Sequence, residues 1–254
     1  MDLALPVALV TGGARRIGRA IVEDLAAHGW AVAIHHHSSH EEATDLALAI
    51  AKSGGKAVAI MGDLGDLTCI DRIVAEAAAA LGPLTLLVNN ASIFEKDTVG
   101  DLDHDRWQRH MTINLAAPVF LTEAFARQLP ADSEGNVVNI LDQRVWRPTP
   151  AFFSYQITKS ALLTVTETLA QALAPRIRVN GIAPGPVLPS AHQSEEHFRR
   201  QTSAVPLHRA PDLADFGRTV RYLVETRSIT GSVIGLDGGQ HLRWKTPGEA
   251  ALDR

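Results

Sequence analysis

The chain has 254 residues, with 24 lysines and arginines against 28 aspartates and glutamates, so its formal net charge is −4. This balance argues against a protein that binds nucleic acid or an anionic membrane, because such proteins need clustered positive charge. Hydrophobic residues make up 46% of the chain and charged residues 20%, which excludes disordered and fibrous proteins and predicts a large core. The 11 histidines are the unusual feature, and four of them are His35, His36, His37 and His40.

Cysteine content and apolar run length predict where the protein resides. Cys69 is the only cysteine, so no intramolecular disulfide can form, and a reducing cytoplasm is favoured. The first residues lead directly into an apolar run without a basic region or a cleavage site, so we expect no signal peptide. No uninterrupted apolar stretch reaches the roughly 18 residues that span a bilayer, so we expect a soluble protein.

Short apolar runs alternate with helical periodicity along the chain. Continuous apolar runs are typical of strands buried on both faces, so the pattern predicts one α/β domain over residues 1–254, with about seven parallel strands and helices on both faces of a doubly wound sheet. Residues 186–210 depart from this rhythm, and we expect them to cross the carboxyl ends of the strands; a short tail follows residue 242. The predicted strands are 7–10, 31–34, 57–61, 84–88, 137–141, 177–179 and 233–236, and helical stretches include 17–28, 42–53 and 70–81.

A glycine-rich turn follows the first predicted strand and reads Thr11-Gly12-Gly13-Ala14-Arg15-Arg16-Ile17-Gly18. Glycines at such a turn let the backbone approach a pyrophosphate, which then binds the unpaired N–H groups at the start of the helix. Two adjacent glycines also mark any tight turn. The position between a strand and a helix is therefore what predicts a dinucleotide site.

The end of the second predicted strand indicates which dinucleotide binds. Sites that prefer NAD have an acidic residue about 20 residues beyond the glycines, where it binds the ribose 2′-hydroxyl. Here the segment reads His35-His36-His37-Ser38-Ser39, and no carboxylate precedes Glu41. Serine hydroxyls, a partly protonated histidine and Arg16 are suited to a 2′-phosphate, so the sequence predicts NADP(H).

Two other interpretations of the histidine segment are open. Successive strand residues point to opposite faces, so His35, His36 and His37 cannot all ligate one metal from a strand, and we predict no metal site. In the other interpretation, His36 and His40 are polar residues at a strand end. Ser39 followed by Glu42 resembles a capping box, which would make Ser39 structural.

Tyr155 and Lys159 are four residues apart in a predicted helix, so the phenol and the ammonium share one face. A lysine charge close to a tyrosine favours the phenolate and lowers the tyrosine pKa. The chain has only two tyrosines, and this one follows the fifth predicted strand. The pair therefore predicts a proton donor that works near neutral pH.

Together these motifs resemble the short-chain dehydrogenase/reductase family over nearly the whole chain. The resemblance implies a Rossmann-type fold in which Tyr155 donates a proton, Lys159 binds the nicotinamide ribose and tunes Tyr155, and Asn114 supports a proton-relay water. It also implies a homotetramer assembled through two long helices and the last strand; residues 160–173 are apolar enough for such a contact, although a core-facing helix would look the same. The implied cofactor contacts are Gly12, Arg15, Arg16, Ile17, Gly18, His37, Ser38, Ser39, Asp63, Leu64, Asn89, Ala91, Tyr155, Lys159, Pro184 and Gly185.

Two departures resemble one branch of that family, the pteridine reductases and dihydromonapterin reductases. Arg16 stands where the family's turn usually has a glycine, and Asp142 replaces the usual catalytic serine thirteen positions before Tyr155. The segments 37–39, 90–94 and 236–243 also resemble this branch. The resemblance implies that NADPH reduces a dihydropterin, with Asp142 bonding the pterin, Phe94 stacking on its ring and Ser92 bonding its edge.

Other interpretations remain open at this stage. Phe94 is also consistent with an ordinary core residue, and Asp142 with a member of the family that has lost catalysis. The first alternative function is an NADP-dependent carbonyl or alcohol oxidoreductase in which Asp142 is incidental. The second is a regulator that binds NADP(H) without turnover.

Overall fold

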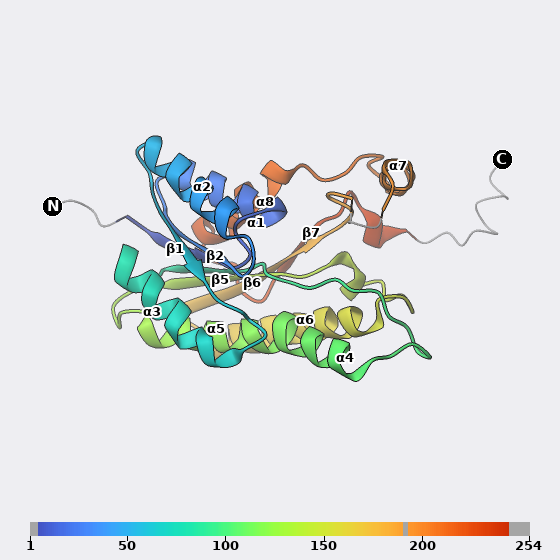
Figure 1. Ribbon diagram of the computed structural model, residues 1–254, viewed down its shortest axis with the longest axis horizontal. Coiled ribbons are helices and arrows are strands. Elements are labelled where there is room, and N and C mark those ends of the chain that lie inside the picture. The colour runs from blue at the N-terminus through green and yellow to red at the C-terminus, as the bar shows by residue number, and fades with distance from the viewer. Residues whose placement is uncertain (1–4, 190–192, 244–254) are drawn as a thin grey trace.

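The structure is a computed structural model that describes residues 5–189 and 193–243. Its centre is a seven-stranded, wholly parallel sheet in the order β3-β2-β1-β4-β5-β6-β7 (Figure 1). The doubly wound α/β fold predicted from the sequence is therefore confirmed. The strands are β1 (Val7–Val10), β2 (Ala31–His36), β3 (Lys56–Met61), β4 (Leu86–Asn89), β5 (Gly135–Ile140), β6 (Ile177–Pro184) and β7 (Val233–Leu236).

Helices cover both faces of the sheet. In Figure 1, α1, α2 and α8 lie above it and α3, α4, α5 and α6 lie below it. Among the residues with a described position, no helix is both long and apolar enough to cross a membrane. The helices are α1 (Arg16–Ala27), α2 (His40–Lys52), α3 (Ile70–Leu81), α4 (His104–Met111), α5 (Ala117–Gln128), α6 (Phe153–Leu173), α7 (Glu195–Ser203) and α8 (Leu213–Glu225).

The core forms two layers because side chains alternate along each strand. Val7 and Leu9 of β1 pack with α3 and α5, whereas Ala8 and Val10 pack with α1, α2 and α8. All four side chains are buried. Burial on both faces explains why β1 is an uninterrupted apolar run.

The structure moves several predicted boundaries. β2 continues through His35 and His36, whose rings are buried, and β6 continues to Pro184 because residues 181–184 pair with β7. Both extensions contain polar residues or glycine, so they do not appear as continuous apolar runs in the sequence. Residues 186–210 contain α7, which begins where the Ser194 side chain accepts a hydrogen bond from the His197 amide.

The strand order places the site. β1 and β4 are neighbours in the sheet, but α1, which follows β1, and α4, which follows β4, cover opposite faces (Figure 1). In open α/β sheets this switch point opens a crevice at the carboxyl ends of the strands, where ligands bind.

Candidate functional site

A cavity of about 690 Å³ lies at the carboxyl ends of the strands. Its wall includes Asp142, Tyr155 and Lys159, the start of α1, and residues 184–188 after β6. Part of the 186–210 segment lines one side of it; residues 190–192 lie outside the described chain. The further lining residues are Asn90, Ser92, Phe94, Lys96, Ile140, Leu141, Gln143, Arg144, Phe152, Gln193, His197, Gln201 and Gln240.

The glycine turn has the shape that a phosphate requires. Gly12 has a φ of +60°, and a Cβ on Gly18 would lie 2.2 Å from the Gly12 carbonyl oxygen. Arg15, at the N-cap of α1, makes no side-chain capping hydrogen bond. The first amides of α1 are therefore left for another acceptor, which is the arrangement that binds a dinucleotide phosphate.

The two arginines of this turn point to different neighbours. Arg16 has a φ of +53°, so it takes the left-handed conformation of the glycine that it replaces. Its guanidinium donates to the carbonyl oxygens of Leu188 and Pro189 at 3.2 Å and 3.1 Å. Arg15 forms an ion pair with Glu42 of α2. Thus Arg15 lies towards the histidine segment, whereas the predicted reach of Arg16 towards a 2′-phosphate is not seen.

The histidines divide by their position on β2. His35 is buried; its Nδ1 accepts from the Gly12 amide at 3.3 Å and its Nε2 lies 3.1 Å from the Gly62 carbonyl oxygen. Burial lowers the pKa of His35 to about 4, so the ring is neutral and joins the glycine turn to the end of β3. The His36 ring instead lies 5.3 Å from the His40 ring.

The segment after β2 is exposed. His37 Nε2 lies 3.8 Å from the Asp63 carboxylate, and Ser38 is exposed. Ser39 is the N-cap of α2, but its side chain makes no capping hydrogen bond, so the predicted capping box is wrong. The Glu42 side chain, the other half of that motif, pairs with Arg15 instead.

β1 and β4 are joined by hydrogen bonds at the edge of the cavity. The Thr11 hydroxyl accepts from the amides of Asn90 and Ala91 at 2.9 Å and 3.0 Å. The Asn90 side chain donates to the carbonyl oxygens of Thr11 and Gly12. Asn89 lies in the interior, where it donates to the Asn139 side chain at 2.9 Å. Asn90, which the sequence analysis did not single out, is the residue of this pair that lines the cavity.

Tyr155, Asp142 and Lys159 meet at the floor of the cavity. The Tyr155 hydroxyl donates to Asp142 Oδ2 at 2.9 Å. Lys159 Nζ donates to the Ile140 carbonyl oxygen at 2.7 Å and lies 5.7 Å from the centre of the Tyr155 ring. One turn of α6 and the end of β5 thus bring together three groups that can hold or donate protons.

Burial controls the pKa values of these three groups. It raises the pKa of Asp142, although the Arg144 amide and guanidinium oppose the shift. Burial and the Asp142 charge raise the pKa of Tyr155 well above its usual value, so the prediction that the Lys159 charge lowers it is wrong. Burial lowers the pKa of Lys159 to about 8, and Asp142 opposes this change. Tyr155 is therefore a neutral phenol.

Asn114 organises the loop after β4. It lies in a single π-helical turn, Thr112–Ala116, between α4 and α5; such turns occur frequently at functional sites. The Asn114 amide accepts from the Ile93 amide and donates to the Ile93 carbonyl oxygen, both at 2.9 Å. Asn114 thus fixes the loop that contains Ser92 and Phe94, and it does not itself line the cavity.

An aromatic group stands beside the tyrosine. Phe94 is 42% exposed, so the core interpretation is wrong. Its ring stacks on Phe152 with centroids 4.1 Å apart and meets the edge of Tyr155 at 4.7 Å. Ser92 is also exposed and lines the same cavity.

Arg144, Phe152 and the pair of Asp97 with Ser154 were also not predicted from the sequence. Arg144 and Phe152 line the cavity beside Asp142 and Phe94; an arginine two positions after Asp142 was a local signal for the first. Asp97 is buried and accepts hydrogen bonds from the Ser154 amide and hydroxyl at the start of α6. No local signal indicates this second pair, because its members are distant in the sequence.

The other predicted residues occupy the rim and walls. Ile17, Pro184 and Gly185 line the cavity. Asp63 accepts a hydrogen bond from the Gly65 amide at 2.8 Å, and Leu64 is buried beside it after β3. Among residues 5–189 and 193–243, no group of three histidine, cysteine, aspartate or glutamate side chains lies close enough together to hold a metal ion.

Comparisons with known proteins agree with this geometry. A family model described as short chain dehydrogenase matches residues 6–200. The structure superposes on FolM alternative dihydrofolate reductase 1 from Brucella canis, complexed with NADP, with a TM-score of 0.94 and 56% identity over 96% of this chain and 97% of that chain. The structure of FolM alternative dihydrofolate reductase 1 from Brucella suis, also in complex with NADP, gives a TM-score of 0.94. It is 57% identical over 98% of this chain and 99% of that chain. The L-rhamnose 1-dehydrogenase (NAD(P)(+)) of Azotobacter vinelandii is 32% identical over 91% of this chain and 94% of its own length.

Proposed function

The chain belongs to the short chain dehydrogenase family, and on that premise we propose that it is an NADPH-dependent reductase of dihydropterins. The observation that supports this most directly is the hydrogen bond from Tyr155 to the carboxyl group of Asp142. A hydroxyl donor suffices for a carbonyl substrate, whereas a carboxyl group suits the basic ring nitrogens of a pterin. The related FolM structures, named as dihydrofolate reductases, point to the same substrate class.

NADP(H) is the cofactor, and bound NADPH supplies the hydride. The glycine turn leaves the first amides of α1 for its pyrophosphate, and no carboxylate follows β2 before Glu41 to repel a 2′-phosphate. Arg15, His37, Ser38 and Ser39 would surround that phosphate. Asp63 and Leu64 would face the adenine.

The inner half of the cofactor would lie along the wall of the cavity. Gly12, Arg16, Ile17 and Gly18 would follow the pyrophosphate, with Asn90 and Ala91 beside the next part of the cofactor; the buried Asn89, which was expected here, would support them from the interior. Pro184 and Gly185 would contact the nicotinamide. Lys159, already held by the Ile140 carbonyl oxygen, would bind the nicotinamide ribose.

The chain's own residues would deliver the proton. As hydride reaches the carbon of the C=N bond, the nitrogen of that bond takes a proton from the Tyr155 hydroxyl. Asp142, whose pKa is raised by burial, can hold a proton and return it to Tyr155 along their hydrogen bond. Asn114 would support the water that renews this proton, while its contacts with Ile93 keep the neighbouring loop in place.

The substrate would lie against Phe94. A pterin is flat, and the exposed face of an aromatic ring provides a stacking surface beside the Tyr155 hydroxyl. Ser92 would bond the edge of the pterin. The outer wall of the cavity, which includes Leu188, Gln193 and His197, would face the pterin's side chain.

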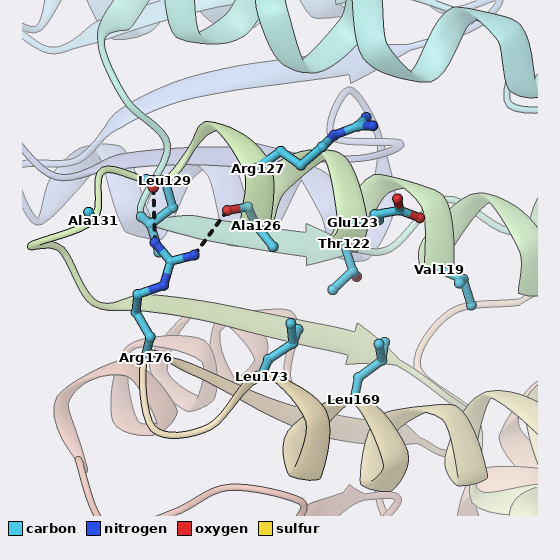
Figure 2. Close-up of a pocket in the computed structure, with 10 residues that line it drawn as sticks. All are labelled: Val119, Thr122, Glu123, Ala126, Arg127, Leu129, Ala131, Leu169, Leu173 and Arg176. Carbon is cyan, nitrogen blue, oxygen red and sulfur yellow. Dashed lines mark hydrogen bonds between the residues drawn. The ribbon is translucent and has the colours of Figure 1, made fainter.

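The same proposal includes a homotetramer. A pocket of about 540 Å³ lies between α5 and α6 (Figure 2), with Leu169 and Leu173 pointing towards α5. Phe120 of α5 is 46% exposed and Ile157 of α6 is 38% exposed. Apolar side chains on an exposed helix pair suit a contact with a second copy of the chain. The protein would act as one catalytic domain, residues 1–254, in the cytoplasm, where its single cysteine stays reduced.

A substrate panel tests the function. We expect NADPH oxidation that depends on dihydromonapterin, dihydrobiopterin or dihydrofolate, followed by absorbance of the cofactor. Tyr155→Phe should lower the rate with each of them by about 100-fold or more, the usual contribution of a proton donor. If none of the three is reduced while ketones or aldehydes are, the proposal is wrong and the alternative of a carbonyl reductase stands. Tight NADPH binding with no turnover of any substrate would instead favour a regulator.

A further inference from the structure

Arg144 lines the cavity and has no role in the proposed reaction described above. Its guanidinium carbon lies 5.2 Å from the centre of the Phe94 ring and 4.9 Å from that of Phe152. The residue lines the same cavity as Asp142 and Tyr155. The cation therefore stands beside the surface on which a flat substrate would stack.

The guanidinium makes no hydrogen bond or ion pair within the described part of the chain. Its Nη1 is buried and makes no hydrogen bond there, and the ion pairs found among those residues do not include Arg144. A buried donor without an acceptor costs free energy, so such a group needs a functional or structural explanation. An acceptor on the bound substrate would supply the missing partner.

Arg16 also lines the cavity, and its guanidinium is already engaged. Its guanidinium donates to the carbonyl oxygens of Leu188 and Pro189. Arg144, in contrast, is held in position through its backbone: its amide donates to Asp142 Oδ1 at 2.8 Å, and its carbonyl oxygen accepts from the Gln156 side chain at 3.0 Å. These bonds fix Arg144 next to Asp142 and leave its side chain for a ligand.

We propose that Arg144 is a substrate-recognition residue that donates a hydrogen bond to the C4 carbonyl oxygen of the pterin. The inference rests on the proposed function and extends it. In a 7,8-dihydropterin the reducible bond is C6=N5, and N5 and the C4 oxygen lie side by side on one edge of the ring. A site that protonates N5 from Tyr155 must therefore meet the C4 oxygen with an adjacent group, and Arg144 stands next to Asp142, the partner of Tyr155.

The consequence is selectivity for 4-oxo over 4-amino pteridines. An amino group at C4 presents donors to a guanidinium, which has only donors of its own. Arg144 thus binds the oxo form and disfavours the amino form. A residue that only supports the Phe94 and Phe152 rings would not distinguish the two.

Equilibrium binding to the NADP⁺-loaded protein tests this without turnover. The probes are folate and its 4-amino analogue, which has the same side chain. Arg144→Met should weaken folate binding by about 10- to 100-fold, the loss expected for a hydrogen bond from a charged donor, and should leave the Kd of the 4-amino analogue unchanged or lower. Arg144→Gln, which keeps an amide donor, should recover part of the folate affinity.

Controls separate this inference from the proposed function. Arg147→Met removes an exposed arginine three residues away and should change neither Kd. An unchanged Kd for NADPH shows that each variant is folded. If Arg144→Met weakens both probes equally, or neither, the inference is wrong while the pterin function stands. If the wild-type protein binds neither probe, both are wrong.

Discussion

The Tyr155 hydroxyl donates to Asp142 Oδ2 at 2.9 Å, at the position where the family's usual serine is absent. Both groups have raised pKa values because they are buried. Burial thus favours the protonated form of each group beside the cavity, compared with the same group in water.

Replacing Asp142 tests whether this carboxyl group takes part in the reaction. With a dihydropterin, Asp142→Ser should lower kcat by about 100-fold or more, because the proton relay to Tyr155 loses its acid. Asp142→Asn, which keeps the shape, should show a similar loss. Steady-state NADPH oxidation measures both. An unchanged or faster rate for the serine variant would favour the carbonyl reductase alternative.

Arg15 should determine the preference for NADPH over NADH. Arg15→Ala should raise the KM for NADPH about tenfold, because an arginine hydrogen bond to a phosphate is worth about 1.5 kcal/mol, and should leave the KM for NADH unchanged. Arg19→Ala is a matched control, since Arg19 is exposed on α1 and pairs with Glu23. Equal changes for the two cofactors would contradict a contact with the 2′-phosphate.

Arg16 combines an unfavourable backbone conformation with a useful side chain. Its φ of +53° costs a non-glycine residue about 1 kcal/mol. Urea unfolding should therefore show that Arg16→Gly is more stable than Arg16→Ala. Both variants should raise the KM for the pterin, because both lose the bonds to Leu188 and Pro189. An alanine variant as stable as the glycine variant would show that the conformation is not strained.

His35 should make stability depend on pH in mild acid. Burial lowers its pKa from 6.5 to about 4, so between these values the unfolded chain binds the proton more readily than the folded one. Above pH 6.5 the ring is neutral in both states, and the free energy of unfolding has its full value. As the pH falls from 6.5 towards about 4, this free energy decreases by up to about 1.4 kcal/mol per pH unit.

The variant His35→Asn isolates this effect, because asparagine has no titrating ring. Urea unfolding at several pH values should show the wild-type advantage over His35→Asn shrinking as the pH falls. A constant difference between the two proteins would contradict the assignment of a neutral, buried ring.

The assembly prediction concerns Phe120. Phe120→Glu places a charge on the exposed face of α5 and should shift the protein from tetramer to smaller species, because burying an unpaired charge at an interface is costly. Analytical ultracentrifugation measures the change. Glu123→Gln is a milder control on the same helix. A wild-type protein that sediments as a monomer would refute the proposed assembly.

The sheet, the glycine turn and the shared helix face of Tyr155 and Lys159 can all be predicted from residue patterns. These features are local: apolar runs reflect burial on both faces, glycines reflect backbone conformation, and a spacing of four reflects one face of a helix. The protonation states of Tyr155 and His35, in contrast, depend on the tertiary structure. Burial, which no short segment reports, reversed the expected pKa shift of Tyr155 and made His35 a neutral bridge.

Contacts between distant segments were also beyond the sequence. Arg16 turned towards Leu188 instead of the histidine segment, and Asp97 reached the start of α6, because loops that are far apart in the chain meet at the carboxyl ends of neighbouring strands. The unpartnered guanidinium of Arg144 became visible only when the aromatic rings around it had been placed. Whether a donor has a partner depends on the whole fold, and a residue's type and spacing do not specify it.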